Sequence, residues 1–190
     1  MRSFDPVRLG GMECDAWVAY YRRQWARFLR AAVGMVHEGF GMPWTSTVQG
    51  AWLVLRANQV WAPYPNNDPD AARQLMRTFY ALVTRTHGET FDVEEAARRE
   101  VEWWRAHREL QREHTGGMDS LVSALTDLYS HVYGVPPATV REAARLRAEA
   151  MQTSDEWVAA DCDPTSPLIE SERSELVDSY TSLLAAVRPA

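Results

Sequence analysis

The stretch that decides the fold is residues 13–38, which read ECDAWVAYYRRQWARFLRAAVGMVHE. Its large apolar side chains recur at steps of four and three, which places them along one side of an α-helix. These side chains are Trp17, Tyr21, Trp25, Phe28, Ala32 and Met35. Because two glycines and then Pro43 follow, the pattern predicts one long amphipathic helix that ends near residue 38.

The same helical period continues along the rest of the chain, and no stretch alternates as a β-strand does. Further helices are predicted over residues 47–61, 69–87, 92–114, 121–132, 139–160 and 167–187. Short connections containing glycine or proline separate them, as is usual between neighbouring helices of a bundle. We therefore expect an all-α, single-domain helical bundle of six to seven helices over residues 1–190, with residues 1–12 as a candidate flexible segment.

Composition excludes several classes of function. The chain has 190 residues and a formal net charge of −6, which argues against nucleic acid as a partner because that contact needs a basic face. All 20 basic residues are arginine, which excludes a Schiff-base lysine and the lysine of a phosphate-binding loop. Cys14 and Cys162 lie far apart, so a disulfide framework and a cysteine-ligated zinc site are not expected.

The sequence predicts neither a signal peptide nor a membrane-spanning helix. The N-terminus lacks the apolar run of a signal peptide. The most apolar stretch, residues 48–61, is too short to span a bilayer and contains Arg56, Asn58 and Gln59. We expect a cytoplasmic protein with no membrane partner.

The helix over residues 47–61 supplies the first candidate site. Its apolar side chains point in nearly every direction around the axis, which predicts a central, buried helix. A buried Arg56 then needs a negatively charged partner. That partner is either an internal carboxylate (Glu13, Asp68 or Glu100) or an anionic ligand, which Asn58 and Gln59 would orient.

The helix over residues 92–114 supplies the second candidate. Glu100, Trp104, His107, Gln111 and His114 follow steps of four and three and so share one face. A carboxylate and two imidazoles are candidate metal ligands, although His107 and His114 lie about 10 Å apart along the axis. The alternative is that these histidines are ordinary polar or core residues, and a single histidine as a haem ligand also stays open.

Three hypotheses of function follow. The first is a small-molecule pocket between the first, second and fourth predicted helices, with His107 as candidate catalytic acid or base. Its ligand-binding residues would be Arg56, Asn58, Gln59, Trp52, Trp104 and Tyr21. The second is a non-enzymatic interaction module or homo-oligomeric scaffold, because the 8 tryptophans suit an interface. The third is haem or metal binding through Glu100, His107 and His114, although the sequence requires no cofactor. Whether the protein is an enzyme stays open.

Overall fold

Eight α-helices and no strands make up the part of the chain that the computed structural model describes, residues 1–188. The helices are α1 (Pro6–Tyr21), α2 (Trp25–Phe40), α3 (Trp44–Trp61), α4 (Pro69–His87), α5 (Val93–Arg108), α6 (Met118–Tyr133), α7 (Pro137–Ala159) and α8 (Leu168–Val187). A π-helical turn, Glu109–Glu113, extends α5. The all-α prediction is confirmed, with eight helices in place of six or seven.

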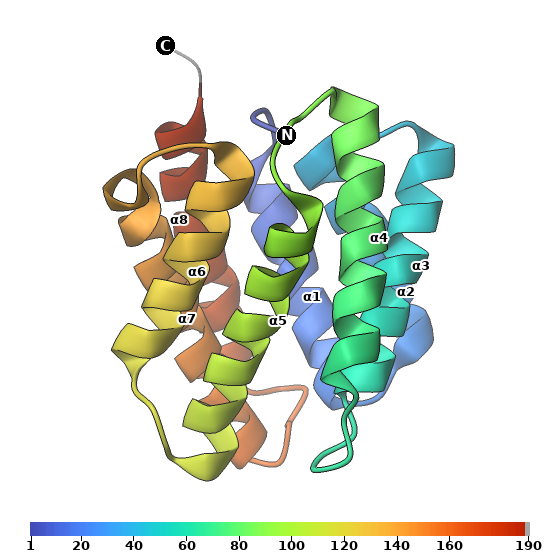
Figure 1. Cartoon of the computed structure of the whole chain (residues 1–190). Helices are drawn as coiled ribbons and strands as arrows, with labels where there is room; N and C mark the ends of the chain where they lie inside the picture. The colour runs from blue at the N-terminus through green and yellow to red at the C-terminus, as the bar shows by residue number, and fades with distance from the viewer. Residues whose placement is uncertain (189–190) are drawn as a thin grey trace.

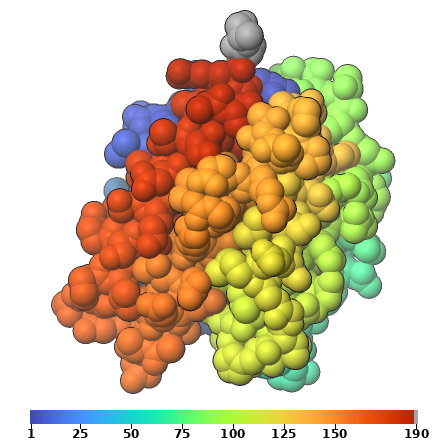
Figure 2. All heavy atoms as spheres, turned by 90° about the vertical axis from the view of Figure 1, so that its left-hand side faces the viewer, coloured from blue at the N-terminus to red at the C-terminus, as the bar shows by residue number. Residues whose placement is uncertain are grey.

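The helices form a closed ring. Each helix packs mainly against its neighbours in the chain, and α8 returns to pack against α1. Figure 1 shows α5 in front and α1 behind it, with α2, α3 and α4 on one side and α6, α7 and α8 on the other. In Figure 2, α6, α7 and α8 (yellow to red) cover most of the side that faces the viewer. The ring therefore has an interior that every helix faces.

The predicted long helix over residues 13–38 is wrong, because the chain breaks there into α1 and α2. Arg23 adopts a left-handed backbone conformation with φ 56°, and the Gln24 N–H donates to the Ala19 carbonyl at 2.8 Å. Large side chains of both helices face the same interior, so the apolar period runs through the break unchanged. The chain reverses without the glycine or proline that usually marks such a turn.

The N-terminal segment is helical from Pro6 onward. The Asp5 side chain caps α1 by accepting the N–H groups of Val7 and Arg8, at 2.9 and 3.2 Å. Such a cap satisfies donors that the first turn leaves free. Residues 6–12, which the sequence marked as a candidate flexible segment, thus lie within α1.

Most of the predicted helix ends are confirmed. Asp68 and Asp92 cap α4 and α5 through their side chains, and Gly88 and Gly134 end α4 and α6 in the left-handed conformation. Helix α3 begins at Trp44, directly after Pro43 and three residues before its predicted start at residue 47. Helix α7 is continuous from Pro137 to Ala159.

One connected cluster of buried apolar side chains joins all eight helices. The ring closes where α1 meets α8, and there the backbones come close together. A Cβ atom on Gly10 would lie 2.8 Å from the Val177 nitrogen and 3.0 Å from the Leu176 carbonyl carbon. Only glycine allows this approach. Within residues 1–188, no helix combines the length and the apolar character needed to cross a bilayer.

Candidate functional site

A cavity of about 260 Å³ lies inside the ring. Side chains from all eight helices line it, which makes the ring interior the candidate site. Its walls are mostly aromatic and aliphatic, and a few charged groups project among them. The aromatic lining residues include Trp17, Tyr20, Trp61, Tyr80, Trp103, Trp104, Tyr129, Tyr133 and Tyr180. Ligand sites in proteins typically combine such walls with a few placed polar groups.

A buried ion pair crosses the interior between α1 and α7. Arg147 donates to Glu13 Oε1 through Nε at 3.1 Å and through Nη2 at 2.5 Å. Tyr180 donates to Glu13 Oε2 at 2.5 Å, and Arg147 donates to the Tyr129 hydroxyl at 3.2 Å. The guanidinium also lies 4.8 Å from the centre of the Trp103 ring. The two charges therefore neutralise each other, and both carboxylate oxygens are satisfied.

Glu100 of α5 faces the same cavity without an ion-pair partner within residues 1–188. Its carboxyl group accepts hydrogen bonds from the Tyr80 hydroxyl at 2.7 Å and the Trp104 indole at 3.2 Å. Burial raises the pKa of Glu100, against smaller lowering effects from Tyr80 and the Arg147 charge. The carboxyl group therefore keeps its proton to a higher pH than a carboxyl in water does. A neutral carboxyl in an apolar cavity can donate a hydrogen bond or a proton.

Arg108, at the end of α5, is half-buried and has no carboxylate partner in the described part of the chain. Its guanidinium donates to the Trp61 carbonyl at 2.9 Å and lies 4.1 Å from the centre of the Trp61 ring. Arg23 donates to the next carbonyl, that of Ala62, at 3.2 Å. Burial lowers the pKa of Arg108, and the nearby Arg112 charge lowers it further. Three cations therefore gather at the C-terminal end of α3.

These three arginines mark where the cavity reaches solvent. Arg23, Arg108 and Arg112 all line the cavity, and Arg23 and Arg112 are exposed. We call this end the mouth. Glu100, Trp104 and Arg108 lie at steps of four along α5, so they span about 12 Å of helix axis on one face. The face presents a carboxyl group in the interior, an indole beside it and a guanidinium at the mouth.

His107 also lines the cavity, and a compact polar group fixes its ring. Its Nε2 lies 3.1 Å from Asp155, and the ring stacks on Trp17 at 6.2 Å between centroids. Gln111 donates to Asp155 at 2.5 Å and to the Tyr21 hydroxyl at 2.9 Å. The structure thus brings together four residues that the sequence pointed to: His107, Trp104, Tyr21 and Glu100. An imidazole oriented by a carboxylate is a suitable acid or base.

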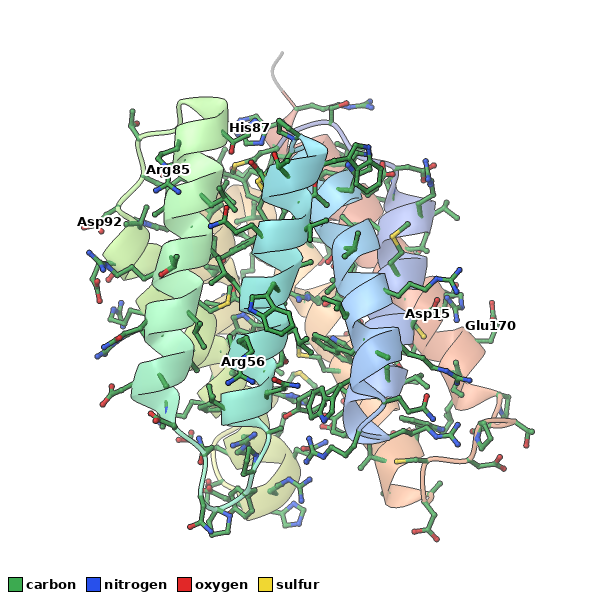
Figure 3. The ribbon with its side chains drawn as sticks, turned by 90° about the vertical axis from the view of Figure 1, so that its right-hand side faces the viewer. Asp15, Arg56, Arg85, His87, Asp92 and Glu170 are labelled. Atoms are coloured by element: carbon green, nitrogen blue, oxygen red, sulfur yellow. The ribbon has the colours of Figure 1, made fainter. Side chains whose placement is uncertain are left out.

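The expected burial of Arg56 is wrong. Arg56 is exposed and donates to Gln59 at 2.7 Å, and Figure 3 shows it on α3 at the side of the molecule. Trp52 also points outward, with 53% of its surface exposed. Neither Glu13, Asp68 nor Glu100 pairs with Arg56. Helix α3 is one member of the ring and not its centre, so part of its apolar surface faces out.

The remaining predicted residues, Asn58 and His114, differ in where they lie. Asn58 lines the cavity, but its side-chain nitrogen donates to the Val54 carbonyl of its own helix at 3.0 Å. His114 is exposed and follows the π-helical turn, away from Glu100 and His107. Within residues 1–188, no group of three or more His, Cys, Asp or Glu side chains is placed to hold a metal ion.

Sequence reasoning missed Arg108 and Arg147 as interior residues, and no charge pattern along the helices marks them. Neither has an acidic residue three or four positions away, whereas Arg105 has Glu102 and Glu109. Many exposed arginines lack such a residue too, among them Arg22, Arg27, Arg30 and Arg141. The absence of a helical partner therefore does not distinguish an interior arginine from a surface one.

Comparisons of the chain with protein-family models, with curated proteins and with solved structures found no match.

Proposed function

We propose that this protein binds a small organic anion with an apolar or aromatic body inside its ring of helices. The acidic group of the ligand contacts Arg108 at the mouth, and its body lies along Trp104 toward Glu100. The observation that carries the proposal is the half-buried Arg108 guanidinium, which lines the cavity without a carboxylate partner in residues 1–188.

The balance of charge in the cavity supports an anion. Arg147 and Glu13 cancel each other, and burial raises the pKa of Glu100, which carries at most one negative charge. Arg23, Arg108 and Arg112 remain, and all three are at the mouth. A guanidinium has five donors, and a carbonyl occupies only part of that capacity. The free donors suit a carboxylate or a phosphate.

These arginines also have a purely structural role, because two of them cap the C-terminal end of α3. Arg23 and Arg108 donate to the last carbonyls of α3, where cations stabilise the negative end of the helix dipole. Capping alone does not require the two side chains to line a cavity, nor does it involve Arg112. The ligand hypothesis accounts for all three positions.

At the inner end of the cavity, Glu100 requires a hydrogen-bond acceptor on the ligand. A protonated Glu100 donates to an acceptor on the ligand, such as a carbonyl or hydroxyl oxygen. Tyr80 and Trp104 already bond to the carboxyl oxygens, so they fix its orientation. We propose that Glu100 hydrogen-bonds to the inner end of the ligand, while Arg108 binds its negatively charged group.

The test uses two probes of similar length and opposite charge, 4-phenylbutyrate and 4-phenylbutylamine. Calorimetric titration of the wild-type protein should detect the carboxylate and not the amine. Arg108→Gln should weaken carboxylate binding by about tenfold or more, because it removes a charge-assisted hydrogen bond. Arg141→Gln removes an exposed arginine of α7 and is the matched control, with binding expected to stay at the wild-type value. Equal binding of both probes, or equal loss in both variants, would contradict the proposal.

A further inference from the structure

The outward face of α3 carries an exposed apolar stripe outside the proposed ligand site. Trp44, Val48 and Trp52 are 62%, 54% and 53% exposed, and they follow one another at steps of four. Arg56 continues the same row by one more step and is also exposed. Figure 3 views the molecule from this side, with α3 between α2 and α4. Large exposed side chains in one row typically mark an interaction surface.

The chemistry of the stripe is simple. Helix α3 contains no carboxylate, and Arg56 is its only charged residue. Trp44 stands at the opposite end of the row, where its ring stacks on His37 with 4.3 Å between centroids and an interplanar angle of 12°. The stripe therefore has an aromatic ring held in place at one end and a cation at the other.

We infer that this stripe is the contact surface of a homodimer, in which α3 packs antiparallel against α3 of a second copy. A two-fold axis between Val48 and Trp52 sets Val48 against the partner's Trp52. The same axis sets Arg56 over the partner's Trp44. A cation over a tryptophan face is an attractive pair, and the symmetry forms it twice.

The geometry of helix packing supports this arrangement. Rows of side chains at steps of four are the ridges that interlock in the commonest class of helix pair, with a crossing angle of about −50°. The two copies of Arg56 lie at opposite ends of the contact, about 18 Å apart along the helix axis, so their repulsion is weak. When Arg56 rotates toward the partner, it loses only its exposed hydrogen bond to Gln59.

A second copy fits this surface better than an acidic or a lipid partner. An acidic partner finds only one cation in the row, and an anionic membrane needs several basic side chains around the apolar ones. The stripe is instead complementary to itself. Arg56 and the open face of Trp44 lie at equal distances from the two-fold axis, so each can contact the other residue in the second copy. A self-complementary patch is what a two-fold homodimer requires.

The test is sedimentation velocity on the full chain over a range up to about 100 µM, a concentration that populates dimers of micromolar Kd. The wild-type protein should move toward twice its monomer mass of 21.6 kDa as concentration rises. Val48→Glu places a carboxylate at the centre of the contact, beside its own symmetry mate, and should raise the dimer Kd by at least about tenfold.

Val7→Glu is the matched control. Val7 lies on α1 and is 66% exposed, so the same change is made at an equally open position away from the stripe. It should leave the Kd unchanged, and circular dichroism should show the helical content of the wild type in both variants. A wild-type protein that stays monomeric at about 100 µM overturns the inference. So does a Val48→Glu protein that dimerises like the wild type, or a Val7→Glu protein that dissociates equally.

Discussion

Charged side chains inside this ring differ in how their charge is balanced. Glu13 and Arg147 balance each other, burial raises the pKa of Glu100, and Arg108 contacts the carbonyl and the ring of Trp61. A charge taken out of water is costly unless one of these means offsets the cost. The first pair is therefore structural, and we propose that the other two residues act on a ligand.

Breaking the buried ion pair should destabilise the fold. Arg147→Met leaves the Glu13 carboxylate, whose side chain is 1% exposed, with Tyr180 as its main donor. We expect a loss of about 3–5 kcal/mol in the free energy of unfolding, measured by urea denaturation. The double variant Glu13→Leu with Arg147→Met should lose less than the sum of the two single changes.

Arg145→Met is the control, on the same helix. Arg145 pairs with Glu142 and Glu149 on the exposed surface, so its removal should cost less than about 1 kcal/mol. If Arg145→Met and Arg147→Met destabilise the protein equally, the interior pair does not have the role assigned to it.

Glu172 of α8 should make stability depend on pH. It is fully buried beside Ser154, and neither of its carboxyl oxygens has a hydrogen-bond partner. Burial, and then the Glu13 charge, raises its pKa from 4.5 to about 8, against smaller opposing effects of Ser154 and Arg173. The folded protein therefore holds a proton that the unfolded chain releases above pH 4.5.

The stabilising effect of this proton is complete below pH 4.5 and is lost as the pH rises to about 8. Urea unfolding at several pH values should show this decline in the wild-type protein. In Glu172→Gln the decline should be much smaller, because the group no longer titrates. An identical pH dependence in both proteins would show that Glu172 ionises freely in the folded state.

The charge pattern of the sequence does not identify these interior residues. Glu13, Glu100, Arg108 and Arg147 all lack an opposite charge three or four positions away, and all four line the cavity. Exposed arginines that also lack one include Arg27, Arg30, Arg56 and Arg141. Only the packing of the ring therefore separates the interior charges from those on the surface.

At the scale of the helix, local chemistry explains what was predictable. Side-chain caps at Asp68 and Asp92 and left-handed glycines at Gly88 and Gly134 are decided within a few residues, so the sequence reveals them. The turn between α1 and α2 has no such marker. It depends on Arg23 adopting a positive φ, and the donation of Arg23 to the Ala62 carbonyl ties it to a distant loop.

The contact that closes the ring should be sensitive to one methyl group. Gly10→Ala places a Cβ against the backbone of α8, which cannot move aside as a side chain can. We expect the free energy of unfolding to fall by about 1–3 kcal/mol, although alanine is the better helix former.

Gly34→Ala is the comparison, because its new Cβ meets only the flexible side chain of Met12. There the helix propensity of alanine should offset most of the cost, so that urea denaturation gives a value near that of the wild type. If the two variants unfold alike, the contact between α1 and α8 is looser than the structure shows.

For the whole molecule, the period of the apolar residues predicts helices but not which side of each faces inward. A ring of eight helices has an inner and an outer surface, and α3 carries apolar side chains on both. The sequence therefore placed Trp52 and Arg56 in the pocket, whereas they lie on the surface where we infer the homodimer contact. The pairing of α8 with α1 joins the two ends of the chain, and no local pattern encodes it.

The most direct test of the proposed ligand site is a crystal structure of the protein with 4-(4-iodophenyl)butyrate, whose iodine marks the end of the molecule away from the carboxylate. The anomalous signal of iodine should appear inside the ring beside Trp104 and Glu100, with the carboxylate within hydrogen-bonding distance of Arg108. Iodine found only on the outer surface, or at the mouth with the carboxylate turned away from Arg108, would contradict an anion site inside the ring.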